Sequence, residues 1–395
     1  MNEYVRFLLL LHLSITMRYF TTFCLFVLLF SSCKTAFVRT VVYNDPGIND
    51  LHILPTREIK ASSQPFEIPY ATSVNTKLLP DSLVDALTTT KTVAFLVMKH
   101  DSIVYEWYAK GYSDSSHTNP FSATKAIVGV LTGIALKEGK IKSLDEPVGN
   151  YLPSFSQDER NKITFRHLLT MSSGVDYYDQ YINPFGKLSK LYYGNDMHKL
   201  INTIHAEKAP GTEWRYKNCD PEILTLALQN AVGKNMSDYA AEKLWQPIGA
   251  NHNAFWTIDS KEAGNEKSYC CFYTNAKDIA KIGMLYEHHG AVGHQQIVDS
   301  FYVKQSVTPV NLPNAERGGV QNHYGYLWWL RNVDGEGDFS MEGMRGQFVM
   351  VVPKEELIVV RLGVKEWDKS GERFKTLSLY PTILRSVLGL WGTKR

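Results

Sequence analysis

The stretch 119-NPFSATKAIVGVL-131 decides the fold and the chemistry expected of this chain. It reads as a loop that runs into a buried helix, because apolar residues recur with helical spacing at Ile127, Val130, Leu131, Ile134 and Ala135. Ser122 and Lys125 are three positions apart, so on a helix they lie on one face. Free N–H groups at a helix N-terminus stabilise a developing anion, and a buried neutral lysine can accept the proton of a serine. The pattern therefore fits a Ser-x-x-Lys nucleophile.

The spacing alone does not decide between two interpretations. Ser31 and Lys34 have the same spacing near the N-terminus, where an active site is not expected. Ser122 as a helix N-cap and Lys125 as a solvated lysine of the first turn explain the pattern equally well. The rest of the chain has to distinguish these interpretations.

Composition bounds the class of protein. The 395 residues are enough for one large domain or two closely packed subdomains. Hydrophobic residues make up 44% and charged residues 21% of the chain, which is typical of a globular protein. A formal net charge of +2 gives no argument for a nucleic-acid partner or for an anionic membrane surface.

Cysteines and histidines predict neither a disulfide framework nor a metal centre. The neighbours Cys270 and Cys271 are not expected to bridge each other, and no Cys/His spacing of the zinc type occurs. His288, His289 and His294 gather near a turn. We expect them to be polar surface residues, because no carboxylate or cysteine completes a metal site nearby.

Residues 1–33 are typical of an export signal, since Arg18 precedes a short apolar run that ends in small residues. Cys33 after two serines resembles the cleavage site of a bacterial lipoprotein, which predicts a periplasmic or outer-membrane-anchored protein. A simple signal or an uncleaved anchor remains an alternative, and Met17 offers a second start. Residues 34–80 show no clear period and are interpreted as a spacer before a domain over residues 81–395.

Hydrophobic periodicity predicts an α+β fold. Helices are expected near residues 83–87, 127–135, 164–174, 221–232, 276–286 and 377–388. Strands are expected at 93–98, 103–108, 324–329, 348–353 and 357–360. Residues 175–200 form a tyrosine-rich insertion of the kind that closes over sites. Strands near both ends then build one antiparallel sheet flanked by helices, and the middle of the chain adds a helical lobe.

Tyr216 is the tyrosine placed like a rigid site element. Tyr-x-Asn triplets begin at Tyr181, Tyr193, Tyr216 and Tyr273. Only the triplet at Tyr216, which ends at Asn218, follows a Pro-Gly-Thr turn and precedes a helix.

The order of these motifs resembles the serine β-lactamase and penicillin-binding-protein superfamily over roughly residues 80–390. The resemblance is to the class C-like branch that also holds esterases, D-aminopeptidases and 6-aminohexanoate-dimer hydrolases. Ser122 to Lys125 resembles the first motif and Tyr216 to Asn218 the second. The third motif differs from the family pattern, because Met341-Glu342-Gly343 lacks the cation that β-lactamases have at the first position of this motif. Arg345 is a candidate to supply that charge.

The resemblance implies a serine hydrolase that needs no metal and no cofactor. Ser122 would attack a small amide or ester, Lys125 would take its proton, Tyr216 would protonate the leaving group and Asn218 would orient Lys125 or the substrate. The resemblance further implies an oxyanion hole from the N–H groups of Ser122 and Met344, with Gly343 beside it. Tyr177, Tyr178, Arg345 and Gln347 are the expected substrate-binding residues.

Two alternatives remain open at this point. One is a β-lactamase or D-amino-acid peptidase acting on cell-wall substrates, and the other is a non-catalytic sensor of the penicillin-binding type. The expected partner is a small-molecule amide or ester, with no nucleic acid and with membrane contact only through an N-terminal lipid anchor. The oligomeric state is left open.

Overall fold

The computed structural model describes residues 36–43, 46–180, 183, 185–365 and 376–393. The expected export signal over residues 1–33, including Cys33, lies outside the described residues. Among the helices described, none combines the length and the apolar character needed to cross a bilayer.

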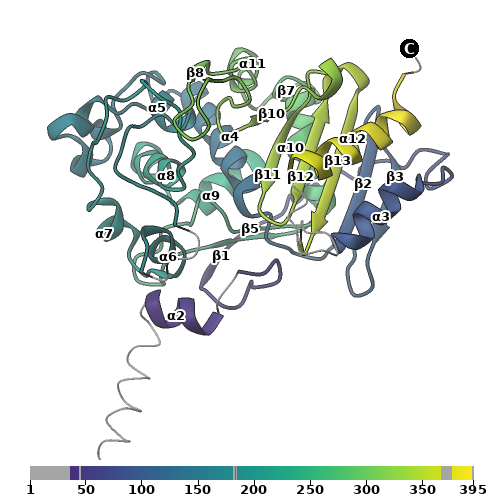
Figure 1. Cartoon of the computed structure of the whole chain (residues 1–395), viewed down its shortest axis with the longest axis horizontal. Helices are drawn as coiled ribbons and strands as arrows, with labels where there is room; N and C mark the ends of the chain where they lie inside the picture. Colours follow the sequence, from purple (N-terminus) through teal and green to yellow (C-terminus); the bar gives the residue numbers. More distant parts are fainter. Residues whose placement is uncertain (1–35, 44–45, 181–182, 184, 366–375, 394–395) are drawn as a thin grey trace, which may run out of the picture.

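Six antiparallel strands form the central sheet, in the order β10-β11-β12-β13-β2-β3 (Figure 1). Their bounds are Thr92–Lys99 (β2), Ser102–Tyr108 (β3), Trp329–Leu330 (β10), Phe339–Gly343 (β11), Gln347–Val352 (β12) and Leu357–Gly363 (β13). Strand β2 from the first third of the chain pairs with β13 from the end, with Val97 opposite Val359. The sheet is therefore built from both ends of the chain, which confirms the predicted architecture.

Helices cover both faces of this sheet. Helices α3 (Asp81–Thr89) and α12 (Thr376–Trp391) contact each other on one face, where they bury apolar side chains such as Phe95 and Met350 (Figure 1). On the other face, α4 (Thr124–Lys137) packs against β11 and α10 (Ala276–Glu287) against β12, β13 and β2. Every residue of α4 from Thr124 to Ala135 is buried, as its apolar spacing predicted.

The middle of the chain forms the helical lobe. Its helices are α5 (Phe165–Leu169), α6 (Lys187–Tyr193), α7 (Met197–Ile201), α8 (Cys219–Val232) and α9 (Met236–Ala240), the last continued by a π turn over Ala241–Trp245. A three-stranded sheet joins β1 (Thr56–Ile59), β4 (Ala254–Thr257) and β5 (Phe272–Tyr273). The remaining elements are α2 (Ala36–Tyr43), α11 (Ser300–Ser306) and the short strands β6 (Ala291–Val292), β7 (Gln295–Gln296), β8 (Leu312–Pro313) and β9 (Val320–Gln321).

Two segments expected to be irregular contain regular structure. Residues 34–80 are more than a spacer, because β1 pairs with β4 and Ile59 is fully buried. The strand Thr56–Ile59 has the sequence TREI, whose single apolar residue gives no alternation that would predict a strand. The tyrosine-rich insertion at 175–200 holds helices α6 and α7, each shorter than the windows in which helical periodicity can be recognised.

Two predicted elements are shorter than expected. The helix predicted over 164–174 is capped by Thr164 as expected but ends at Leu169, and Met171 takes a φ of +54° that a helix cannot continue through. The aromatic strand predicted over 324–329 was wrong for most of its length. Leu327 has a φ of +62°, and only Trp329 of that stretch lies in a strand.

The cysteine prediction was wrong. Cys270 and Cys271 form a disulfide with each other, and Cys219 is a free, buried thiol. Successive side chains alternate across an extended strand, whereas Cys271 has a φ of +75°, which breaks that alternation.

His288, His289 and His294 are exposed, as predicted. The reason given for that prediction was wrong at His288, because side-chain ligand atoms of Asp101, Glu287 and His288 all lie within 4.8 Å of one another. Asp101 is almost two hundred residues away in the sequence, so the spacing of local motifs gave no signal for this cluster.

Candidate active site

Ser122 sits in a tight turn, residues 119–123, that is fixed from both sides. The side chain of Phe121 is buried, and its backbone has a φ of +47°. This value lies in the left-handed region, which residues other than glycine adopt rarely. The amide oxygen Oδ1 of Asn119 accepts hydrogen bonds from the backbone N–H groups of Phe121 at 2.9 Å and Cys271 at 3.2 Å. The turn leaves Ser122 half-buried at the entrance to α4.

Lys125 lies one helical turn beyond Ser122 and touches it. Its Nζ is 2.7 Å from Ser122 Oγ and 2.8 Å from the backbone oxygen of Tyr269. Lys125 is only 1% exposed, and burial lowers its pKa to about 7 against the opposing effect of the Asp179 and Glu222 carboxylates. Because such an amine loses its proton near neutral pH, it can act as a base toward Ser122.

Tyr216 reaches the same lysine from the helical lobe. Lys125 Nζ lies 4.9 Å from the centre of the Tyr216 ring. The backbone N–H of Tyr216 donates to Glu316 Oε1 at 3.0 Å, and the ring stacks on Trp329 with centroids 5.7 Å apart. Tyr324 and Trp214 complete an aromatic wall around it, which we define as Trp214, Tyr216, Tyr324 and Trp329.

Asn218 contacts Asp179, an acid that the sequence analysis did not single out. Its backbone N–H donates to Asp179 Oδ2 at 3.1 Å, while its own buried Oδ1 has no hydrogen-bond partner among the described residues. Burial raises the pKa of Asp179, and the Asn218 side chain opposes that rise. Asp179 comes from the tyrosine-rich insertion, and no motif marks it out there. Only the folding of that insertion over α8 reveals it.

Glu222 is a second buried acid missed by the sequence analysis. It lies in α8, and Ser268 donates to its Oε2 from both N–H at 2.9 Å and Oγ at 2.7 Å. Burial raises the pKa of Glu222 to about 7, and Lys267 lowers it. Together with Asp179, this carboxyl sets how strongly the site holds the proton of Lys125.

Strand β11 ends directly beside the nucleophile. A Cβ atom on Gly343 would lie 2.0 Å from the carbonyl oxygen of Pro120 and 3.2 Å from the backbone nitrogen of Ser122. Glycine is therefore required for the strand to approach the turn this closely. The next residue, Met344, is half-buried at the same edge.

Replacing Gly343 by Ala should force β11 away from Ser122. We expect kcat to fall about 10- to 100-fold, because a misplacement of about 1 Å can cost about 10²-fold in rate. Steady-state kinetics with a chromogenic ester measures this effect. Gly389→Ala is the matched control, since a Cβ there meets no atom within 4 Å. An unchanged kcat in Gly343→Ala would show that this close approach does not position the reacting groups.

The third motif carries no free cation. Met341 is fully buried and apolar. Glu342 accepts from the guanidinium of Arg331, through Nε at 2.6 Å and through Nη2, and from Ser340 Oγ at 2.8 Å. The acid at the centre of the motif is thus neutralised within the sheet.

Arg345 and Gln347 hold the turn between β11 and β12. Arg345 donates to the backbone oxygens of Pro46 and Val364 at 2.8 Å each. Gln347 is fully buried and bonds the backbone of Gly363 through both ends of its amide, at 2.6 and 3.0 Å. These contacts direct both side chains to the backbone of neighbouring segments.

Arg361 supports the same turn and was missed in the sequence. Its buried guanidinium donates to the backbone oxygens of Arg345 at 2.6 Å and Gly346 at 2.7 Å. It therefore fixes the loop that carries Met344 past the nucleophile. An arginine in an apolar strand gives no hint of this role.

The two predicted tyrosines of the insertion differ in exposure. Tyr177 is fully buried, and burial raises its pKa well above the ordinary value. Tyr178 is exposed, and its hydroxyl donates to Glu207 while the Arg215 guanidinium lies 5.3 Å from its ring.

Comparisons with known proteins show similarity over most of the chain. A family model described as Beta-lactamase matches residues 80–366. The chain is 22% identical over 305 residues to a 6-aminohexanoate-dimer hydrolase of Paenarthrobacter ureafaciens, covering 72% of this chain and 75% of that protein.

Solved structures share the fold. A Bacillus anthracis protein described as a 6-aminohexanoate-dimer hydrolase superposes with a TM-score of 0.74 at 20% identity, covering 88% of this chain and 94% of that one. A family VIII carboxylesterase has a TM-score of 0.61 at 17% identity, covering 81% and 99%. These likenesses confirm the predicted fold and support a hydrolase of the β-lactamase and esterase type. The chain belongs to the β-lactamase family, within the superfamily of serine β-lactamases and penicillin-binding proteins.

Proposed function

We propose that this protein is a serine hydrolase that cleaves an amide or ester through an acyl-enzyme on Ser122. The observation that carries the proposal is the 2.7 Å contact between Ser122 Oγ and Lys125 Nζ, made by a lysine whose pKa burial lowers to about 7. A surface lysine would be protonated at neutral pH and could not accept the serine proton.

The reaction proceeds in two steps. In the first, Lys125 takes the proton of Ser122 while Oγ forms a bond to the substrate carbonyl carbon. Tyr216 protonates the leaving amine or alcohol as its bond to that carbon breaks, and Lys125 returns a proton to Tyr216. In the second, a water attacks the ester on Ser122 and gives a proton to the same network, which passes it to Oγ as the bond between Oγ and the acyl carbon breaks, so that a carboxylic acid leaves and Ser122 is restored.

The N–H groups of Ser122 and Met344 stabilise the oxyanion of both tetrahedral intermediates. The close approach of Gly343 to the Ser122 nitrogen supports this pairing. Only the main chain of Met344 takes part, so the proposal places no demand on its side chain.

A small linear amide or ester is the substrate class we favour. The relatives named above include a 6-aminohexanoate-dimer hydrolase and a carboxylesterase. The buried Met341 offers no cation for the carboxylate of a β-lactam, and Arg345 donates to backbone oxygens. Tyr216 and Trp329 are the half-buried members of the aromatic wall, and their rings offer apolar surface suited to an apolar acyl or leaving group.

Covalent labelling tests the proposal directly. A fluorophosphonate probe should add to wild-type protein with one label per chain, and peptide mass spectrometry should place it on Ser122. Ser122→Ala should remain unlabelled. A label on another residue would refute the assignment of the nucleophile, and an unlabelled, folded wild-type protein would favour a non-catalytic sensor. Turnover of nitrocefin faster than that of linear esters and amides would favour a β-lactamase instead.

A further inference from the structure

A cluster of possible metal ligands lies at the end of the sheet opposite to Ser122. Gly343, beside Ser122, pairs with Gln347 at one end of the β11–β12 hairpin, whereas Lys99 pairs with Leu357 at the other end of the sheet. Asp101 follows Lys99 by two residues and forms the cluster with Glu287 and His288. The cluster is therefore separate from the hydrolase site and does not depend on the proposed function.

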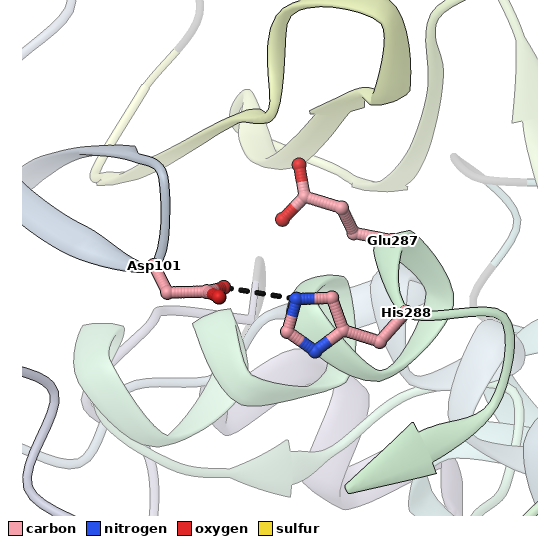
Figure 2. A group of neighbouring side chains, drawn as sticks. All are labelled: Asp101, Glu287 and His288. Carbon is pink, nitrogen blue, oxygen red and sulfur yellow. Dashed lines mark ion pairs between the residues drawn. The ribbon is translucent and has the colours of Figure 1, made fainter. Parts of the chain in front are cut away.

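Two rigid segments bring the three side chains together. Asp101 lies in the turn between β2 and β3, where His100 and Asp101 both have left-handed φ values, of +50° and +59°. Glu287 is the last residue of α10 and His288 is its C-cap. Figure 2 shows Asp101 entering from the hairpin and the other two side chains from the end of the helix.

The contact between Asp101 and His288 is not an ordinary hydrogen bond. His288 Nε2 lies 3.0 Å from Asp101 Oδ1, yet this buried oxygen has no partner with hydrogen-bond geometry among the described residues. Two ligands about 2.1 Å from one Zn²⁺ lie about 3.0 to 3.4 Å apart for octahedral to tetrahedral angles. The separation therefore matches two atoms of one coordination shell.

Glu287 supplies the third donor. Its Oε1 is buried and has no hydrogen-bond partner in the described part of the chain. A buried carboxylate oxygen without a donor is costly. The carbonyl end of α10 adds partial negative charge at the same place, which favours a cation there. Neighbouring cations in the described part of the chain have other partners: Lys99 pairs with Glu355 and His100 with Glu356, and Lys281, which lines the same cavity, pairs with Asp278.

We propose that Asp101, Glu287 and His288 bind one divalent transition-metal ion of the Zn²⁺ class. One imidazole nitrogen with two carboxylates suits Zn²⁺ and its neighbours, whereas Ca²⁺ and Mg²⁺ prefer oxygen ligands alone. A cavity of about 310 Å³ is lined by Asp101 and His288 together with apolar residues such as Met284 and Leu285. It gives water access to complete the coordination shell. The ion would join the β2–β3 turn to the end of α10.

Calorimetric titration of metal-free, tag-free full-length protein with ZnCl₂ tests this site. We expect one equivalent of Zn²⁺ to bind the wild type. Glu287→Gln and His288→Ala should each weaken binding at least as much as the roughly 10- to 100-fold that loss of an outer-shell partner costs. His294→Ala is the matched control, because His294 is an exposed histidine of the neighbouring β6–β7 turn outside the cluster. It should bind as the wild type does.

A second readout separates coordination from folding. Co²⁺ bound to the wild type should give visible absorption bands that shift or vanish in His288→Ala. Circular dichroism without metal shows whether each variant folds, and Asp101→Asn replaces any variant that does not. Equal Zn²⁺ affinity in the wild type and both ligand variants would refute the site, as would the absence of saturable one-equivalent binding. In that case the Asp101–His288 contact is only an ion pair. Tighter binding of Ca²⁺ than of Zn²⁺ would refute the role of the imidazole.

Discussion

Ser122→Ala is expected to lower kcat/KM for a chromogenic short-chain ester by at least about 10⁴-fold, because loss of the nucleophile in a comparable acyl-enzyme mechanism costs up to about 10⁶ in kcat. The fold should persist. Ser122 is half-buried, and within the described residues its side chain makes one hydrogen bond, with Lys125, which keeps its bond to the Tyr269 carbonyl. The free energy of unfolding should change by no more than about 1.5 kcal/mol, the size of one hydrogen bond.

The measurement pairs hydrolysis rates with a urea unfolding curve for the same preparation. Ser115→Ala serves as the control, since Ser115 is exposed in the loop before the nucleophile turn. It should keep wild-type activity. If Ser122→Ala retained more than a few per cent of the wild-type rate, a nucleophile other than Ser122 would have to carry the reaction.

The parts of the site that the sequence revealed are those set by local geometry. The pairing of Ser122 with Lys125 follows from helical spacing, and the structure confirms it with a direct contact. Tyr216 was found because a turn and a helix start on either side of it fix its direction, and its ring lies beside the same lysine. The sheet strands were recognised because their residues are apolar almost without interruption, as in β2 and β13.

The residues that the sequence did not reveal depend on contacts between distant segments. Asp179 acquires its place beside Asn218 only when the insertion packs on α8, and Arg361 supports the Met344 loop from another strand. The Asp101 cluster joins a hairpin turn to a helix end. Positive φ values at non-glycine residues, such as Leu327 and Cys271, were likewise not predicted from the sequence, and they made the secondary-structure prediction wrong there. No period or propensity marks such positions, because their cause lies in the packing.

Burial of Lys125 favours activity, because it makes the amine a base, but it lowers the stability of the folded protein. Taking Lys125 out of water disfavours its charged form, and this is the reason that its pKa falls to about 7. The protein therefore holds an amine at a position where an apolar side chain would be more stable. Active sites commonly accept such a cost, and it should be measurable here.

Lys125→Met should lower kcat for the ester by about 10²- to 10⁴-fold, the range that a general base contributes. In the wild type, kcat/KM should rise with pH through about 7 as Lys125 loses its proton, and this rise should be absent in the variant. Lys137→Met at the exposed end of the same helix is the control and should keep the wild-type profile. A pH profile that is the same in Lys125→Met as in the wild type would contradict the assignment of Lys125 as the base.

The same variant should be more stable than the wild type at neutral pH. Between about pH 7 and the ordinary lysine pKa of 10.5, the unfolded wild type binds a proton that the folded protein does not, so wild-type stability rises with pH across this window. Methionine has no such dependence. The advantage of Lys125→Met in free energy of unfolding should therefore be largest at pH 7 and below, and shrink as the pH rises toward 10.5. A difference that stays constant from pH 6 to pH 10 would mean that Lys125 titrates as an ordinary exposed lysine, and it could not then serve as the base for Ser122.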